Sequence, residues 1–303
     1  MKAAIVTGAN GFIGKVLCEI LIEQKVHTYA IVRKKEAMDD IQCSYLTVIE
    51  LDMEHYQRLP QIIKEEIDVF YHLAWEGASG AILADYSQQI KNIQYTCDTI
   101  EIASKMNCRK FIMAGTINEL ELMQLFEAEE NPPRPACIYG ISKLACDMMC
   151  KTIAAKNEMN FNVAIIGSCF GPGDTSKRIH NVFISHMLKG IRPKLVEANN
   201  MHDWIYVDDV AKMFFAIGEK SVNMKNYYLG HNQLRVFREI LEEVRDILNP
   251  QMELVFGEIK TPFFIDYDLV NLNSVYEDTG YQCESDFKDN ILKTAQWVKE
   301  QGL

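Results

Sequence analysis

The first 21 residues constrain the fold of this 303-residue chain more than any other stretch. A short apolar run at residues 2–7 is typical of a buried parallel strand, and it leads directly into Gly8, Gly11 and Gly14. An apolar helical pattern follows over residues 12–21. Free backbone N–H groups and the helix dipole at such a helix N-terminus attract a phosphate. The stretch therefore predicts a dinucleotide site, and the alternative is a structural turn.

The spacing G-x-x-G-x-x-G gives each glycine an expected task. Gly8 permits the tight turn, Gly11 lets a pyrophosphate approach the backbone, and Gly14 lets the helix pack close to the strand. The pattern alone is weak, but here the strand and the helix flank it as the dinucleotide motif requires.

Strand-like and helix-like patterns alternate through the first half of the chain. Such alternation predicts a parallel, doubly wound α/β sheet of the Rossmann type with right-handed crossovers. The expected strands are residues 2–7, 26–32, 46–51, 67–74, 109–114 and 161–166, and the later helices are residues 56–65, 86–106 and 138–155.

The rhythm changes after Asp174, and regular alternation ends. We expect a dinucleotide-binding domain over residues 1–170, rejoined by part of 203–230, and a smaller substrate-binding domain made mainly of residues 171–303. This second part should cap the carboxyl edge of the sheet, where open α/β folds bind ligands. Its expected elements are helices at 179–188, 236–248 and 287–301, a strand at 227–229, and apolar stretches at 193–196 and 204–210.

Composition excludes several classes of function. The net charge of −11 argues against a nucleic-acid partner, and no apolar run has the length of a membrane span. The chain enters a strand at once, so we expect no secretory leader and a cytoplasmic protein. Nine cysteines without a C-x-x-C pair are expected to be reduced. The seven histidines have no ligand spacing, so we predict no metal.

The ends of the second and third strands bear on the choice of cofactor. An acidic residue about 20 positions past the glycines usually holds the ribose 2′-hydroxyl of NAD, but Arg33 stands there, followed by Lys34 and Lys35. A guanidinium suits a 2′-phosphate, so the chain is expected to prefer NADP(H), with NAD(H) possible. The alternative is a solvated basic loop. Asp52, after the third strand, could accept from the adenine amino group.

Tyr139 and Lys143 form the second key stretch. At i and i+4 on a helix both side chains lie on one face, and an ammonium beside a phenol lowers the phenol pKa. The pair is therefore expected to supply a general acid or base.

These residues carry a resemblance that runs almost end to end. The chain resembles extended short-chain dehydrogenases/reductases of the NAD-dependent epimerase/dehydratase family, whose members modify nucleotide sugars. The matching pieces are residues 7–14, 71–74, Asn92, 111–116, Tyr139 with Lys143, 170–174 and 204–211.

The resemblance implies roles for single residues. Thr116 takes the place of the family's Ser or Thr, which binds the substrate oxygen beside Tyr139 and Lys143; a strand-end cap is the alternative. Asn92 is implied to support the lysine through its helix and water, or to be only structural. The residues expected to bind the cofactor are Gly8, Asn10, Gly11, Phe12, Ile13, Gly14, Arg33, Asp52, Met53, Leu73, Ala74, Trp75, Asn92, Tyr139 and Lys143.

The chain also departs from the family pattern where the substrate diphosphate is gripped. His202 replaces the usual arginine before Asp203, and Ser168 replaces an asparagine before the Gly-Pro-Gly turn. Lys177 and Arg178 could supply the missing charge, or they form a solvated basic pair. We expect a nucleotide-sugar substrate that contacts Ser168, Lys177, Arg178 and His202.

The leading hypothesis for function is NADPH-dependent reduction of a C4 keto group on a nucleoside-diphosphate deoxysugar. Arg33 favours NADP and hence net reduction, and Trp75 and Glu119 also resemble such reductases. A C4 epimerase or 4,6-dehydratase with retained NAD is the alternative within the family, with Glu119 and Glu121 available as acids. A non-catalytic NADP(H)-binding sensor or scaffold is the alternative of another class. By resemblance, helices 86–106 and 138–155 pair two chains into a homodimer.

Overall fold

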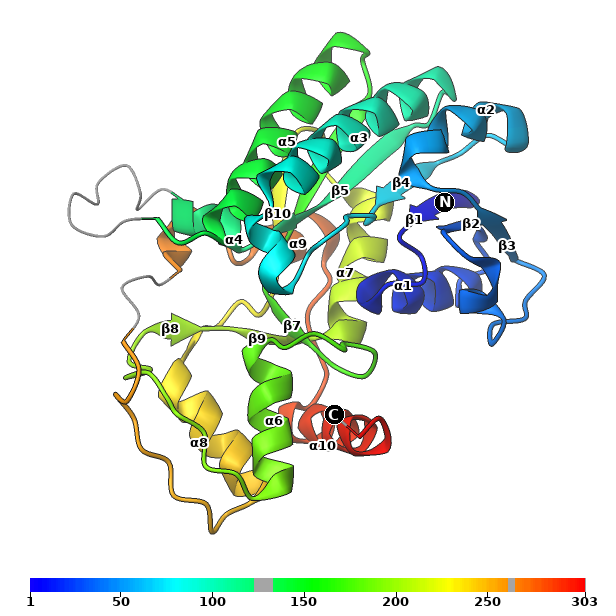
Figure 1. The fold of residues 1–303 in the computed structure, drawn as a ribbon. Helices are drawn as coiled ribbons and strands as arrows, with labels where there is room; N and C mark the ends of the chain where they lie inside the picture. The colour runs from blue at the N-terminus through cyan, green and yellow to red at the C-terminus, as the bar shows by residue number, and fades with distance from the viewer. Residues whose placement is uncertain (123–132, 261–264, 303) are drawn as a thin grey trace.

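A computed structural model describes residues 1–122, 133–260 and 265–302. It has an upper part built on one large sheet and a lower part of helices and short strands, joined along the carboxyl edge of that sheet (Figure 1). The N-terminus lies in the upper part and the C-terminus in the lower.

The large sheet has seven parallel strands in the order β10-β6-β5-β4-β1-β2-β3. This order confirms the predicted doubly wound sheet, because the chain starts in the middle, winds to one edge and then reverses. The strands are β1 (Ala3–Thr7), β2 (His27–Val32), β3 (Leu46–Glu50), β4 (Val69–His72), β5 (Lys110–Thr116), β6 (Asn160–Ile166) and β10 (Asn226–Leu229).

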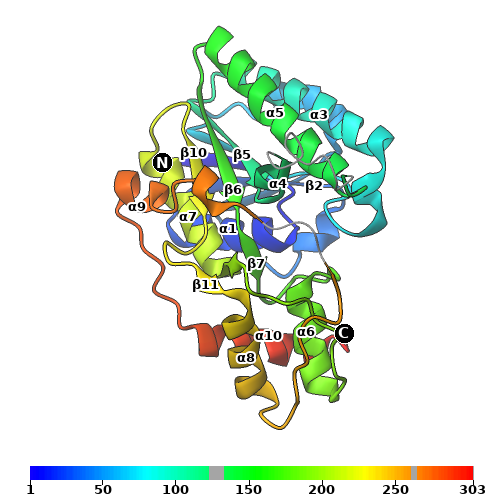
Figure 2. The same ribbon diagram turned by 90° about the vertical axis from the view of Figure 1, so that its left-hand side faces the viewer.

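Helices cover both faces of the sheet, and each face has its own apolar core. The long helices α3 (Tyr86–Lys105) and α5 (Cys137–Lys156) lie side by side on one face, and α1 (Phe12–Glu23) and α7 (Val207–Lys220) lie on the other (Figures 1 and 2). Buried parallel strands need this double cover because both of their faces are apolar. A ligand can therefore bind at an edge of the sheet, between the two layers of helices.

Two stretches differ from the sequence-based expectation. Residues 56–65 do not form one helix: a 3₁₀ turn (Met53–Arg58) is followed by the single turn α2 (Leu59–Ile62). Pro60 lies at the start of α2, and a proline has no N–H to continue a helix that began earlier. Residues 204–210 are divided between β9 (Trp204–Tyr206) and the start of α7, a helix that the sequence analysis missed.

The lower part contains α6 (Ile179–Lys189), α8 (Phe237–Leu248) and α10 (Phe287–Glu300), which pack against one another (Figure 1). Two small sheets connect it to the large one: β7 (Ser168–Phe170) pairs with β9, and β8 (Met201–His202) pairs with β11 (Arg235–Val236). Among the described residues, the remaining elements are short: α4 (Asn118–Glu121), α9 (Ser274–Thr279) and 3₁₀ turns at Lys35–Met38, Gly80–Ala84 and Tyr267–Leu269. Within the described residues, no helix is long and apolar enough to cross a membrane.

Candidate active site

The glycine turn between β1 and α1 has the geometry of an anion cradle. Gly8 has φ +66°, and a Cβ there would lie 2.9 Å from the backbone nitrogen of Ala74. A Cβ at Gly14 would overlap the carbonyl oxygen of Gly8, so α1 packs directly against the turn. Gly11 is the N-cap of α1, and no side chain caps the helix start. The first N–H groups of α1 are therefore left for an anion, and the turn fits the pyrophosphate of a dinucleotide.

The end of β4 is fixed against this turn by a buried hydrogen-bond chain. The hydroxyl of Thr7 accepts from the Ala74 N–H (3.2 Å) and bonds to Nδ1 of His72 (2.9 Å). The other ring nitrogen of His72 lies 3.3 Å from the hydroxyl of Thr96. Burial lowers the pKa of His72 to about 3, so the ring is neutral. These bonds hold the apolar Leu73 and the small Ala74 beside the glycine turn.

Arg33 and Asp52 lie at the neighbouring ends of β2 and β3. Arg33 is exposed, and the Asp52 carboxylate caps the following 3₁₀ turn by accepting from the Met53 N–H (2.7 Å). Both charges act on the buried phenol of Tyr56, whose pKa is raised chiefly by burial, further raised by Asp52 and lowered by Arg33. The two residues thus share one edge of the sheet, next to the glycine turn.

Thr116 and Tyr139 line the same cavity. Thr116 ends β5, and its hydroxyl donates to the side-chain oxygen of Asn118 (3.1 Å). Burial raises the pKa of Tyr139 to about 12, against opposing effects of the Arg178 charge and the nearby Thr116 hydroxyl, while Glu119 raises it further. The expectation of a lowered phenol pKa was wrong for this arrangement: burial outweighs the nearby positive charge, and the phenol keeps its proton at neutral pH.

The Lys143 ammonium has two partners outside α5. Its Nζ donates to the carbonyl oxygen of Ala114 (2.8 Å) and lies 3.8 Å from the ring centroid of Trp75. The Trp75 ring meets the Tyr139 ring edge-on, with centroids 6.0 Å apart. Burial lowers the pKa of Lys143 to about 8.

Asn92 lies on α3, buried, and bonds to the chain after β4. Its side chain accepts from the N–H of Glu76 (3.1 Å) and donates to the carbonyl oxygen of the same residue (2.7 Å). The Asn92 side chain thus bonds to Glu76 and Gln89 rather than to Lys143. Asn92 therefore fixes the loop that carries Trp75.

The cavity that contains Thr116 and Tyr139 has a volume of about 690 Å³ and lies between the sheet edge and the lower part of the molecule. All four residues expected to bind substrate line it: Ser168, Lys177, Arg178 and His202. Ile13 of the glycine turn lines it as well. The structure therefore brings Thr116, Tyr139 and the four expected substrate residues to one cavity, whereas Lys143, also expected to be catalytic, is not part of its lining.

Sequence analysis missed two cationic residues of this cavity. Arg134 and Lys194 line it, as does Glu121, which forms an ion pair with Arg134. Each of the two cations follows a proline, Pro133 or Pro193, and a proline-fixed loop was the only local signal for them. Four cationic residues against one carboxylate line the cavity within the described part of a chain whose net charge is −11.

His202 is not a charged substitute for an arginine. Its ring stacks on Phe237 (centroids 4.3 Å apart), and burial lowers its pKa to about 4. Positive charge comes instead from the other walls of the cavity, including Arg178, whose guanidinium donates to the carbonyl oxygen of Ala78 (3.4 Å).

The two glutamates after Thr116 have different surroundings. The Glu119 carboxylate accepts from the Thr116 N–H (2.7 Å), and burial raises its pKa to about 7. It is outside the lining of the large cavity, whereas Glu121 lines it in its ion pair with Arg134. Glu119 thus supports the end of β5 from the α4 side.

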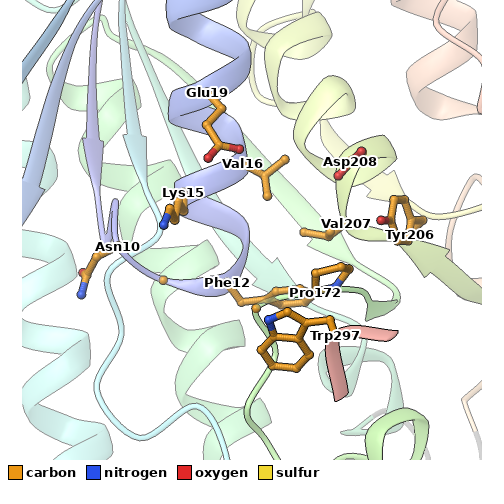
Figure 3. Close-up of a pocket in the computed structure, with 12 residues that line it drawn as sticks. Asn10, Phe12, Lys15, Val16, Glu19, Pro172, Tyr206, Val207, Asp208 and Trp297 are labelled. Carbon is orange, nitrogen blue, oxygen red and sulfur yellow. The ribbon is translucent and has the colours of Figure 1, made fainter. Parts of the chain in front are cut away.

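A second, smaller cavity of about 350 Å³ lies along α1, between that helix, α7 and α10 (Figure 3). Asn10 and Phe12, both expected to bind cofactor, line this cavity rather than the large one. Lys15, Glu19, Asp208 and Trp297 form much of its remaining wall (Figure 3). Among the described residues, no group of three or more histidine, cysteine or acidic side chains could hold a metal ion.

Comparison with known families decides the relationship. The model of the NAD dependent epimerase/dehydratase family matches residues 4–230, from the first strand of the large sheet to its last. The chain belongs to this family. As a member of the epimerase/dehydratase family it is an NAD(P)-dependent enzyme of the extended short-chain dehydrogenase/reductase class, as its motifs predicted.

The relatives of this family member have low sequence identity but align with most of its length. A dTDP-glucose 4,6-dehydratase of Mycolicibacterium smegmatis is 24% identical over 256 residues, 78% of this chain and 76% of that protein. The UDP-N-acetylglucosamine 4-epimerase from Methanobrevibacter ruminantium M1, solved with UDP-N-acetylmuramic acid, has a TM-score of 0.80 at 21% identity, over 99% of both chains. The UDP-glucuronic acid 4-epimerase from Bacillus cereus, solved with NAD, has a TM-score of 0.77 at 20% identity, over 98% of this chain and 97% of that one. These two structures have the fold of this chain.

Proposed function

We propose that this epimerase/dehydratase family member reduces a keto group, at C4 of a nucleoside-diphosphate deoxysugar, with NADPH. The observation that carries the proposal is that Tyr139 and Thr116 line one cavity together with four cationic side chains. Reduction of a ketone needs a proton donor at the carbonyl oxygen, and a phenol that keeps its proton at neutral pH can supply one. An anionic substrate is favoured because four cations face one carboxylate in the cavity.

In this proposal each residue has a role that follows from its position. Thr116 donates to or orients the carbonyl oxygen of the substrate, and Tyr139 gives that oxygen its proton. Lys177, Arg178 and Lys194 hold the diphosphate, with His202 as a neutral contact. The cofactor supplies a hydride, and the glycine turn and the start of α1 hold its pyrophosphate.

Arg33 supports NADPH as the cofactor. It is exposed at the end of β2, beside the glycine turn, where an NAD-binding chain usually carries an acid. A guanidinium paired with a 2′-phosphate makes charge-assisted hydrogen bonds worth roughly 1.5–3 kcal/mol. That energy corresponds to a preference of about ten- to a hundredfold for NADPH over NADH.

Titration of the protein with NADPH and NADH, followed by the fluorescence of the bound reduced cofactor, tests this proposal. Wild type should bind NADPH more tightly, and Arg33→Asp should invert the preference because a carboxylate repels a 2′-phosphate and accepts from a 2′-hydroxyl. Lys34→Asp, one residue further along the same exposed loop, is the matched control and should leave the order unchanged. Equal affinity of wild type for both cofactors would sink the NADPH assignment.

A measurement of turnover distinguishes an enzyme from a protein that only binds NADP(H). A panel of nucleotide-linked 4-keto sugars should cause NADPH absorbance to fall with at least one member. Tight cofactor binding with no oxidation of NADPH over the whole panel would count against the reductase.

A C4 epimerase is the second candidate, favoured by the named 4-epimerases whose folds match nearly the whole chain. An epimerase returns the hydride to the same sugar and keeps its NAD, so the isolated protein would carry bound NAD and convert a 4-hydroxy sugar without net cofactor use. A 4,6-dehydratase has less support from the geometry. It needs a further acid or base beside the substrate, whereas Glu119 bonds to the backbone of Thr116 and Glu121 is paired with Arg134.

We also propose a homodimer formed by α3 and α5. Apolar side chains remain exposed on both helices, among them Tyr86, Ile90, Ile141, Met148 and Met149. Large apolar side chains exposed on two neighbouring helices favour association.

A further inference from the structure

The side chains of Trp75 and Lys143 are in contact, and the proposed reaction assigns this contact no role. Trp75 lies in the loop after β4, and Lys143 lies on α5, 68 positions later. The ammonium sits 3.8 Å from the centroid of the indole ring, within the range of a cation–π contact. Its hydrogen bond to the Ala114 carbonyl (2.8 Å) fixes the other side. The lysine is 4% exposed, so water has little access to its charge.

The indole is itself fixed by side chains of α3. Its Nε1 donates to the side-chain oxygen of Gln89 (2.9 Å), and Gln89 is fully buried. The amide of Gln89 also donates to the carbonyl oxygens of Gly77 (3.2 Å) and Ile82 (3.1 Å). These bonds tie the whole loop after β4 to α3, so the indole is held at a set position over the lysine.

We propose that Trp75 is a positioning residue for Lys143: its ring shields the ammonium from water and holds it at the end of β5, one helical turn from Tyr139 on α5. This inference rests on the proposed function, because the sequence analysis places Lys143 among the residues expected to bind the cofactor. An aromatic face contributes here because it excludes water without removing the attraction that keeps a cation in place.

Several titratable groups lie close enough to Lys143 to interact with its charge. Glu119 approaches from α4, and Cys146 and Cys150 approach from α5 itself. His72 approaches from β4 and is neutral. Burial is the largest influence on the lysine, and the acidic groups oppose it by favouring the charged form.

The sign of the Trp75 effect follows from two opposing contributions. The attraction between ring and ammonium favours the charged form and raises the lysine pKa, whereas exclusion of water disfavours it and lowers the pKa. The pKa of Lys143 lies near 8, below the ordinary 10.5, with the indole in place. The proposal assigns a share of this exclusion of water to the indole, so loss of the ring should raise the pKa.

Two substitutions separate shielding from a general structural role. Trp75→Ala removes the ring and lets water reach the ammonium, so the pKa of Lys143 should rise by at least one pH unit. Trp75→Phe keeps an aromatic face but loses the hydrogen bond to Gln89, so its pKa should stay within about half a unit of the wild-type value. The matched control is Trp297→Phe, because Trp297 lies in the wall of the second cavity. This substitution should leave the pKa of Lys143 unchanged.

The pKa can be measured without cofactor or substrate. Protein labelled with carbon-13 at lysine Cε is titrated from pH 6 to 11, and the Lys143 signal is identified by its loss in Lys143→Met. The proposal is overturned if Trp75→Ala leaves the pKa unchanged or lowers it. It is also overturned if Trp75→Phe moves the pKa as far as Trp75→Ala.

Cofactor affinity gives a second readout. If the ammonium binds the cofactor, wild-type affinity should fall as pH rises through about 8, and in Trp75→Ala the fall should move up by the same interval as the lysine pKa. Above both midpoints a shift of one unit corresponds to a tenfold gain for the variant. Failure of wild type to bind either cofactor would count against the proposed function, whereas the NMR titration would still decide the role of Trp75.

Discussion

At the scale of single residues, Tyr139 is the group whose removal should cost the most activity. Tyr139→Phe deletes the phenol proton without changing the ring that packs against Trp75, so cofactor affinity should stay within about twofold of wild type. General acid catalysis is typically worth about 10² to 10⁴ in rate, and turnover of a keto sugar should fall by that factor. Steady-state NADPH oxidation measures it.

Tyr276→Phe is the control for this experiment, because Tyr276 is an exposed tyrosine on α9. The control should retain full turnover. A Tyr139→Phe enzyme that keeps turnover within threefold of wild type would remove Tyr139 from the mechanism.

The sequence could predict which residues meet at the site more easily than how their side chains are turned. The spacing of Tyr139 and Lys143 predicted one helix face, and both residues do lie on α5. It could not predict that the Lys143 ammonium bonds to Ala114 and lies against Trp75, because these partners come from other elements. Burial of Tyr139 likewise depends on the whole cavity wall, so its raised pKa was not foreseeable from the i, i+4 pattern.

At the scale of elements, the contact between α1 and the glycine turn carries a prediction. Gly14→Ala places a methyl group against the Gly8 carbonyl, so α1 or the turn must move. Overpacking of this kind typically costs about 1–3 kcal/mol of stability. The displaced helix start should also weaken NADPH binding by about tenfold or more, equal to about 1.4 kcal/mol. Urea unfolding and cofactor titration measure the two effects.

Gly190→Ala is the matched control for Gly14→Ala. Gly190 ends α6 with φ +66°, and nothing lies within 4 Å of a Cβ placed there. The control should lose about 1–2 kcal/mol of stability through left-handed backbone strain and keep its cofactor affinity. If Gly14→Ala binds NADPH as well as this control does, close packing of α1 is not needed for the cofactor.

Elements of the first half were predictable because their signals are local. β1 and α1 follow directly from an apolar run, a glycine turn and an apolar helical pattern. The helix expected at 56–65 failed because Pro60 restarts it as the short α2. Missing α7 had a different cause: the apolar run of β9 continues into the helix without a turn, although Val210, Phe214 and Ile217 keep the helical spacing.

At the scale of the whole molecule, the large cavity is the feature least visible in the sequence. Its cations come from loops and helix ends that are far apart in the chain, such as Arg134 before α5 and Lys194 after α6. Only the folding of the lower part onto the sheet edge brings them together. A chain with a net charge of −11 thereby presents a locally positive hollow.

Assembly is the last property that the whole molecule allows to be tested. α3 and α5 lie side by side in one layer of the molecule (Figure 1). Tyr86, Ile90, Ile141 and Met148 on these two helices are exposed. If this layer is a two-fold interface, light scattering at micromolar concentration should give about twice 34.8 kDa. Replacement of Ile141 and Met148 together by lysine places like charges near their symmetry copies and should give the monomer mass. Leu292→Lys, an equally apolar exposed position on α10, should leave the dimer intact. A wild-type monomer, or a dimer that survives both lysines, would place the interface elsewhere or remove it.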